Sequence, residues 1–254
     1  MLGAMDRRKF TASLATALSP DAAAQPCVEL RAYRTQPGRR DELIDLFEQN
    51  FLDAYEQGGA RILGSFRTPD DPDRWVWLRA FDGPLARREA LEAFYSSAAW
   101  LAGRDACNAT IADTRDAWLL READGAGSPA PPSPAAQPGC YLLELHRPSA
   151  RESGSFVRDY RSLALPLSRD LGAVPLLQWV EDRRKNLYPR QHLRSGATFV
   201  LLTRFVDASM RDTFLARRRA TPAWSRRVRP RLLSRLRAAP WVLRLDPTSR
   251  SRLR

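Results

Sequence analysis

The sequence predicts an α+β protein in which two tandem ferredoxin-like βαββαβ units fold face to face as one pseudo-twofold α+β barrel. Three observations support this fold class. Residues 123–139 are rich in Pro, Gly, Ala and Ser and lack apolar periodicity, as a linker does. The segments on its two sides resemble each other at constant spacing, and the first has the hydrophobic pattern β-α-β-β-α-β. The 254 residues are enough for two units that each bury a core.

The two copies align at two successive spacings. Cys27 aligns with Cys140 and Gly59 with Gly172, and both pairs are 113 residues apart. Further along, the spacing is 124 residues, for Trp75 with Phe199 and for Trp100 with Trp224. Because the spacing grows from 113 to 124, the second copy has 11 additional residues, which we place in a loop near residues 186–194. The predicted domains are residues 27–122 and 140–254.

Each element of the first copy has its own signal. Residues 27–34 alternate in polarity as a strand does, and Pro37-Gly38 ends that run. The next element is a helix, predicted by apolar residues at three- and four-residue spacing: Leu43, Leu46, Phe47, Phe51 and Tyr55. Gly58-Gly59 ends this helix. Strands at 60–68 and 74–81, a helix at 86–95 and a strand at 117–121 complete the unit.

This order of elements covers one face of an antiparallel sheet with helices and leaves the other face partly apolar. The open face has to be buried. A second copy on the same chain supplies that cover, sheet against sheet, so a monomer contains what other proteins build as a dimer.

The composition argues against a membrane-spanning helix, a disulfide framework and a cysteine metal site. No stretch approaches the roughly 20 apolar residues that a membrane-spanning helix needs. Cys27, Cys107 and Cys140 are too few for a disulfide framework and contain no C-x-x-C pair, so we predict no metal site.

Residues 1–26 have the layout of a twin-arginine export signal. Arg7-Arg8 precede a short apolar run at 11–19, and Ala22-Ala23-Ala24 offers a small-residue cleavage site. We therefore predict export to the periplasm, and the alternative is a disordered leader on a cytoplasmic protein.

The formal net charge of +12 is concentrated near the C-terminal end. Residues 210–254 contain 14 arginines against Asp212 and Asp246. On a helix these arginines form a basic amphipathic surface, whose predicted members are Arg217, Arg218, Arg226, Arg227, Arg231 and Arg235. Such a surface suits anionic lipid, nucleic acid or an acidic partner, although no nucleic-acid recognition motif is present. The alternative is a solvated helix in an arginine-biased protein.

Several short motifs of the first copy together resemble the NIPSNAP family. They are Glu29-Leu-Arg-x-Tyr-Arg-x-x-Pro-Gly38, Gly64-Ser-Phe66, Trp77-Leu-Arg-x-Phe81, Phe94-Tyr95, Trp100 and Asn108-Ala-Thr-Ile111. The resemblance implies the dimeric α+β barrel fold, an undefined biochemical activity and, with the export-like leader, a bacterial member. Related barrels include cofactor-free monooxygenases and haem-dependent enzymes, an analogy of fold only.

Six residues are candidates for a ligand pocket: Arg31, Tyr33, Trp77, Tyr95, Glu144 and His146. Alternation places Arg31 and Tyr33 on one face of the first strand, and the repeat puts Glu144 and His146 at the matching positions. If that face lines the barrel, Arg31 meets Glu144 near the pseudo-twofold axis and the pair can hold a polar ligand. The alternative is a structural ion pair or a solvated face. For the aromatic candidates the alternative is ordinary core packing.

No catalytic motif is present, and no cofactor is predicted. His146 and His192 are the two histidines, so haem binding, a minor alternative, has to use one of them. The sequence favours a small-ligand-binding or interaction scaffold. A cofactor-independent barrel monooxygenase acting on a small aromatic or quinone-like substrate is the alternative. Two such chains can also associate as a homo-oligomer.

Overall fold

The computed structural model describes residues 25–124, 139–173 and 175–254. The predicted export signal lies outside these ranges, as does most of the predicted linker. The first unit contains β1 (Cys27–Thr35), α2 (Arg40–Leu46), the π-helical segment η1 (Phe47–Phe51), α3 (Leu52–Gln57), β2 (Arg61–Arg67), β3 (Arg74–Phe81), α4 (Pro84–Ser96), α5 (Ala98–Thr110), β4 (Ile111–Asp113) and β5 (Ala117–Glu122).

Within the described residues, the second unit has the same series of strands except that it lacks a counterpart of β4. It contains β6 (Cys140–His146), η2 (Ala150–Glu152), α6 (Ser153–Asp159), the π-helical segment η3 (Tyr160–Ala164), α7 (Leu165–Asp170), β7 (Pro175–Glu181), β8 (Phe199–Phe205), α8 (Ala208–Ala220), the π-helical segment η4 (Ala223–Val228), α9 (Arg229–Leu233) and β9 (Trp241–Pro247).

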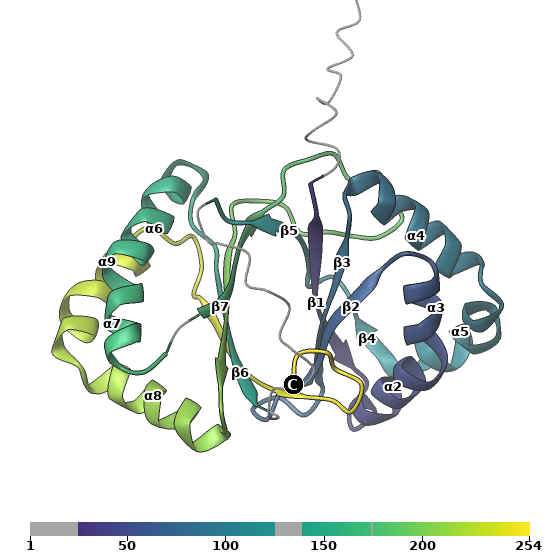
Figure 1. Ribbon diagram of the computed structural model, residues 1–254, viewed down its shortest axis with the longest axis horizontal. Helices are drawn as coiled ribbons and strands as arrows, with labels where there is room; N and C mark the ends of the chain where they lie inside the picture. The colour runs from purple at the N-terminus through teal and green to yellow at the C-terminus, as the bar shows by residue number, and fades with distance from the viewer. Residues whose placement is uncertain (1–24, 125–138, 174) are drawn as a thin grey trace, which may run out of the picture.

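Eight of the nine strands in the described residues close into an antiparallel barrel. The first unit has the strand order β5-β1-β3-β2 and the second has β7-β8-β6-β9. The units are joined where β2 pairs with β9 and where β5 pairs with β7. Figure 1 shows the helices of each unit on opposite sides of the barrel. The predicted fold class is confirmed.

The barrel interior is apolar and is shared by both units. Along β1, Val28, Leu30 and Ala32 pack inside with side chains such as Leu143 and Val200 of the second unit. These residues alternate with a polar face that lies under the helices of the first unit. The polar face therefore does not line the barrel, and the condition for a contact between Arg31 and Glu144 is not met. A closed interior shields its side chains from water, so the apolar face turns inward and the polar face finds partners among the helices.

The first helix departs from the prediction by a π-helical segment at its middle, and the second unit has a π-helical segment at the matching place. Gly59, at φ +97°, ends the helix as predicted. Helix α5 is not predicted by the residue pattern; Ser97 caps it by accepting a hydrogen bond from the Trp100 backbone N–H at 3.2 Å.

In the described part of the chain, no helix is long and apolar enough to cross a bilayer.

The connection between β7 and β8 spans residues 182–198, whereas the matching connection between β2 and β3 spans 68–73. In Figure 1 this longer connection is the green loop that reaches from the second unit towards α4 of the first. We call residues 182–198 the cover loop.

The last seven residues tie the second unit back to the first. The chain end lies at one end of the barrel in Figure 1. The Leu253 N–H donates to the Leu63 carbonyl at 3.0 Å, and the Leu253 side chain is buried with the barrel interior. The Thr248 hydroxyl donates to the buried Glu48 carboxylate. Part of the basic C-terminal segment therefore serves in packing.

Candidate functional site

A cavity of about 520 Å³ lies between the outer face of the first unit's sheet and its helices. Ligand pockets commonly have volumes of about 300–1,000 Å³, so this one suits a small molecule. Its walls are mostly aromatic, and we call it the aromatic cavity. Its lining rings include Phe47, Phe51, Tyr55, Trp75, Trp77, Phe94, Tyr95, Trp100 and Tyr188.

Strand alternation and helix packing produce the aromatic walls. Trp75 and Trp77 are two residues apart on β3, so both point to the helices, and their rings stack at 5.2 Å. Across from them, Tyr55 of α3 stacks on Phe94 of α4 at 3.5 Å. Tyr95 contacts Trp100 edge to face at 5.1 Å. These rings fix one another, so the walls form a rigid apolar surface.

The cover loop of the second unit forms one wall of the aromatic cavity. Tyr188, Gln191 and His192 come from this loop and line the cavity. The Tyr188 ring lies parallel to that of Tyr95 at 6.1 Å. Outside the cavity, Arg194 fixes the loop by a backbone hydrogen bond to the Ala117 carbonyl at 2.7 Å. The site is therefore built from both units.

One end of the aromatic cavity is polar. The Arg31 guanidinium donates through Nε to the Tyr33 hydroxyl at 2.8 Å. The Gln191 carboxamide oxygen accepts from Arg79 Nη2 at 2.6 Å and from Arg31 Nη1 at 3.5 Å. On its other side, the Gln191 amide donates to the Tyr95 hydroxyl. Thus Arg31, Tyr33, Trp77 and Tyr95, four of the six predicted pocket residues, line one cavity.

Behind this polar end lies a buried group that we call the arginine cluster, formed by Glu29 with Arg31, Arg79 and Arg87. Glu29 Oε2 accepts from Arg79 Nη2 at 2.5 Å and from Arg31 Nη1 at 3.2 Å, and Arg87 Nε donates to Oε1. Burial alone would raise the pKa of the Glu29 carboxyl, but the three guanidinium groups outweigh burial and hold it far below its usual range. Glu29 is therefore ionised.

The arginine cluster carries more positive charge than Glu29 can cancel. All four side chains are at most 3% exposed, so three cations surround one anion with little access to water. The neutral side chains of Gln191 and Asn186 accept hydrogen bonds from Arg79 and Arg87 at 2.6 and 2.9 Å. Arg79 Nη1 and Arg87 Nη2 are buried and have no partner in the described part of the chain. The cluster therefore creates a positive field at the polar end of the cavity.

The remaining two predicted pocket residues, Glu144 and His146, lie under the helices of the second unit. Glu144 accepts from Arg218 Nη1 at 3.0 Å and from the Tyr160 hydroxyl at 3.1 Å. The predicted Arg31–Glu144 pair does not form, since each strand presents its polar face to its own helices and the apolar interior separates the two faces. Arg31 pairs with Glu29 instead.

His146 is buried among the rings of Phe156, Tyr160 and Phe199, and neither of its nitrogens has a hydrogen-bond partner within the described residues. Burial lowers the pKa of His146 to about 4, although the Glu144 carboxylate opposes this shift. In the unfolded chain a histidine titrates near pH 6.5.

This shift predicts acid sensitivity. Between pH 6.5 and about 4, the unfolded chain binds a proton at this histidine and the folded chain does not. The contribution of His146 to the free energy of unfolding is therefore constant above pH 6.5 and becomes less favourable to the folded state as the pH falls towards 4. We expect a loss on the order of 3 kcal/mol across that window in urea unfolding at a series of pH values. His146→Phe should remove this component and His192→Phe should retain it. An unchanged pH profile in His146→Phe would contradict the assignment.

The two histidines lie in different places. His146 is buried under the helices of the second unit, whereas His192 is exposed and lines the aromatic cavity. The described residues contain no group of three His, Cys, Asp or Glu side chains placed to hold a metal ion.

The six arginines of the predicted basic surface differ in their exposure and in their ion pairs. Arg218 is buried against Glu144, so its assignment to the surface is wrong. Arg231 and Arg235 both pair with Asp159, at 2.9 and 2.8 Å. The other three predicted members are exposed and form no ion pair in the described ranges: Arg217, Arg226 and Arg227.

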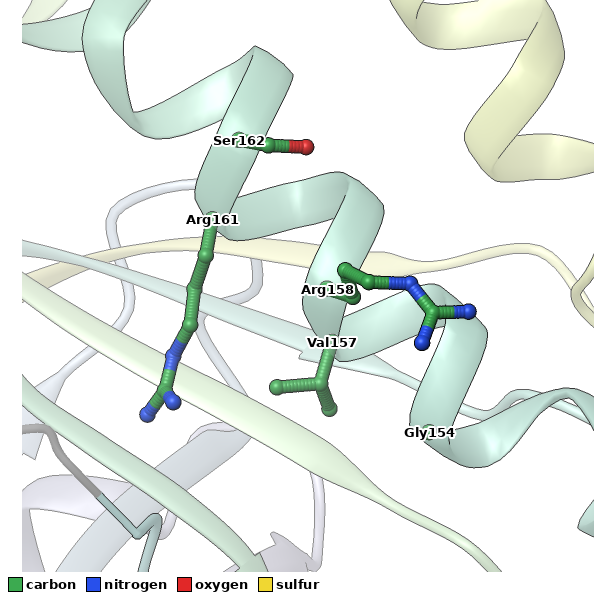
Figure 2. A pocket seen from close by; sticks show the side chains of 5 residues that line it. All are labelled: Gly154, Val157, Arg158, Arg161 and Ser162. Carbon is green, nitrogen blue, oxygen red and sulfur yellow. The ribbon is translucent and has the colours of Figure 1, made fainter.

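A second hollow, of about 530 Å³, lies on the outside of the second unit. Figure 2 shows that its five residues all come from the α6–η3 helix and that their side chains do not converge on one point. Arg161 already donates to the Asp124 carbonyl at 2.5 Å. This open hollow therefore lacks the convergent polar groups of a ligand site.

Solved structures share the fold over most of the chain. An anthrone oxidase-like protein is 12% identical, with 89% of this chain and 93% of that chain covered and a TM-score of 0.58. A proposed monooxygenase from Fusobacterium nucleatum is 8% identical, with 88% and 93% covered and a TM-score of 0.55. The chain has the dimeric α+β barrel fold. At these identities the likeness shows the fold alone.

The predicted resemblance to NIPSNAP proteins is found again over a shorter length. A NIPSNAP family protein from Agrobacterium tumefaciens is 18% identical, with 40% of this chain and 90% of that chain covered and a TM-score of 0.38. No protein-family model and no curated protein sequence matches the chain.

Four side chains of the candidate site were not predicted from the sequence. Arg79 lies directly opposite Glu29 in the β1–β3 register, so strand pairing contains a signal for that contact. Arg87, Tyr188 and Gln191 reach the site from a helix and from the cover loop. For Tyr188 and Gln191, the only signal was the aromatic and amide content of the inserted loop.

Proposed function

We propose that the protein binds a small planar aromatic molecule in the aromatic cavity. The observation that carries this proposal is a volume of about 520 Å³ bounded by stacked and edge-on rings, with polar groups gathered at one end. Ligand sites are commonly clefts of about 300–1,000 Å³ with mostly apolar walls and a few polar groups that fix the ligand. The space beside Trp77 and Tyr95 has these properties.

The test is calorimetric titration of the full chain with 2-naphthoate and uncharged 2-naphthamide, planar probes of suitable size. We expect saturable binding at one site per chain for at least one probe. Thr114, half-buried at the cavity wall, allows a blocking variant, Thr114→Trp. Thr213→Trp, on the exposed face of α8, is the matched control. Binding lost only in Thr114→Trp supports the proposal, and equal binding by both variants places the probe elsewhere.

A cofactor-independent oxygenase is the second candidate. The Tyr33 and Tyr95 hydroxyls lie at the cavity next to Arg31, where they can hydrogen-bond an oxygen of an aromatic or quinone-like substrate. Two proteins that share the fold are named as an anthrone oxidase-like protein and a proposed monooxygenase. An oxygen electrode on anthrone-type substrates separates the candidates: uptake that Tyr95→Phe abolishes favours the enzyme, and no uptake favours a binding protein.

A further inference from the structure

The charge of the cavity walls limits the ligand more narrowly than their shape does. No Asp or Glu is among the residues that line the aromatic cavity within the described ranges. Its charged lining residues are Arg31 and Arg190, and the excess cations of the arginine cluster lie directly behind Arg31. A cationic ligand is therefore disfavoured and an anionic one is attracted.

Two hydrogen-bond donors at the polar end remain unused. Arg31 donates through Nε to Tyr33 and through Nη1 to Glu29. Its Nη2 forms no hydrogen bond within the described residues. Tyr33 accepts from Arg31, and its own hydroxyl hydrogen has no acceptor there. Both groups are more than nine-tenths buried, so unused donors at this place need an acceptor from a ligand or from water.

Gln191 satisfies the arginines without neutralising them. Its carboxamide oxygen accepts from Arg79 and Arg31 but carries no charge. A carboxylate at the same position would cancel one of the excess cations. The neutral side chain therefore leaves the charge of the arginine cluster available to a bound molecule.

We propose that the ligand is a planar aromatic anion whose charged oxygen atoms bind Arg31 and Tyr33 at the Gln191 end of the aromatic cavity. This inference rests on the proposed function and specifies the class of ligand. The ring occupies the space between Trp77 and Tyr95, and the carboxylate or phenolate oxygen accepts hydrogen bonds from Arg31 and Tyr33. Gln191, from the second unit, is then a specificity-determining residue for a site in the first.

The test compares 2-naphthoate with uncharged 2-naphthamide, which has the same ring and a similar head group. Because hydrogen bonds between ionised partners are about twice as strong as neutral ones, we expect naphthoate to bind at least about tenfold more tightly. Equal affinities would overturn the anion proposal and leave the proposed function standing. If neither probe binds, the proposed function itself fails.

Gln191→Glu gives a sharper comparison, because it adds a charge with almost no change of shape. The new carboxylate competes for Arg31 and Arg79, so naphthoate affinity should fall at least about tenfold while naphthamide affinity stays within about twofold. Gln57→Glu, on the exposed end of α3, makes the same chemical change away from the site and should alter neither. A Gln191→Glu variant that keeps the preference for naphthoate contradicts the proposal.

p-Nitrophenol extends the test to phenolates, since its absorption spectrum reports its ionisation. At a pH where the free probe is mostly protonated, we expect the bound probe to show the absorption band of the phenolate. A bound probe with the neutral spectrum contradicts the proposal. Comparison of its affinity with that of naphthoate shows whether a carboxylate or a phenolate suits the site better.

Discussion

Glu29→Gln is expected to lower the free energy of unfolding by about 3–5 kcal/mol. Glu29 is fully buried and accepts hydrogen bonds from three arginines. The amide keeps the shape of the side chain but removes the one negative charge of the arginine cluster. Three buried guanidinium groups then face one another without a counter-charge, which breaks a buried ion-pair network from its centre. Urea unfolding at neutral pH measures the effect.

The matched control is Glu42→Gln, which removes the same charge from an exposed pair. Glu42 contacts Arg39 in a bidentate pair at 2.6 and 2.8 Å, but both side chains are well exposed. Exposed pairs contribute at most about 1 kcal/mol, so the control should change little. Equal small effects of both substitutions would mean that water screens the arginine cluster and that its field at the cavity is weak.

Phe66→Ala should also cost about 3–5 kcal/mol, as large-to-small changes of buried aromatic residues do. Phe66 lies on β2, is fully buried in the barrel interior and contacts the Tyr141 ring of the second unit at 5.4 Å. The residue is buried only because the two sheets close on each other, so its loss tests the contact between units. Differential scanning calorimetry or urea unfolding gives the change.

Leu85→Ala is the comparison for Phe66→Ala, because Leu85 is 46% exposed on α4 and should change the stability by about 0.5 kcal/mol or less. A double-mutant cycle between Phe66 and Tyr141 should in addition give a coupling of about 0.5–1.5 kcal/mol. A small effect of Phe66→Ala together with no coupling to Tyr141 would show that the units do not share a core.

The fold could be predicted because its signals are local and repeated. The spacing between Cys27 and Cys140 and the strand pattern of the first copy define two like units, and like units with open apolar faces bury them against each other. Alternation along β1 separates two faces but does not by itself say which turns inward. The rule that a closed interior takes the apolar face would have assigned Val28 and Leu30 correctly, and with them the outward position of Arg31.

Only part of the candidate site could be predicted from the sequence. Tyr33, Trp77 and Tyr95 come from the first copy, whose motifs mark them, and they do line one cavity. Gln191 is far away in the sequence and reaches the site because the insertion in the second copy folds over the first. No local pattern encodes such a contact, since it depends on how the two units dock. Arg87 was missed because its partner Glu29 lies on another element of the first unit, and no local pattern encodes a contact between a helix and a strand that are far apart in the sequence.

A crystal structure of the full chain grown with 2-naphthoate would show where the ligand binds. We expect the naphthalene ring inside the aromatic cavity, with its carboxylate within hydrogen-bond distance of Arg31 and Tyr33 and the cover loop beside it. A probe bound outside the cavity, for example at the α6–η3 hollow, or a cavity occupied by water alone at saturating probe, would contradict this expectation.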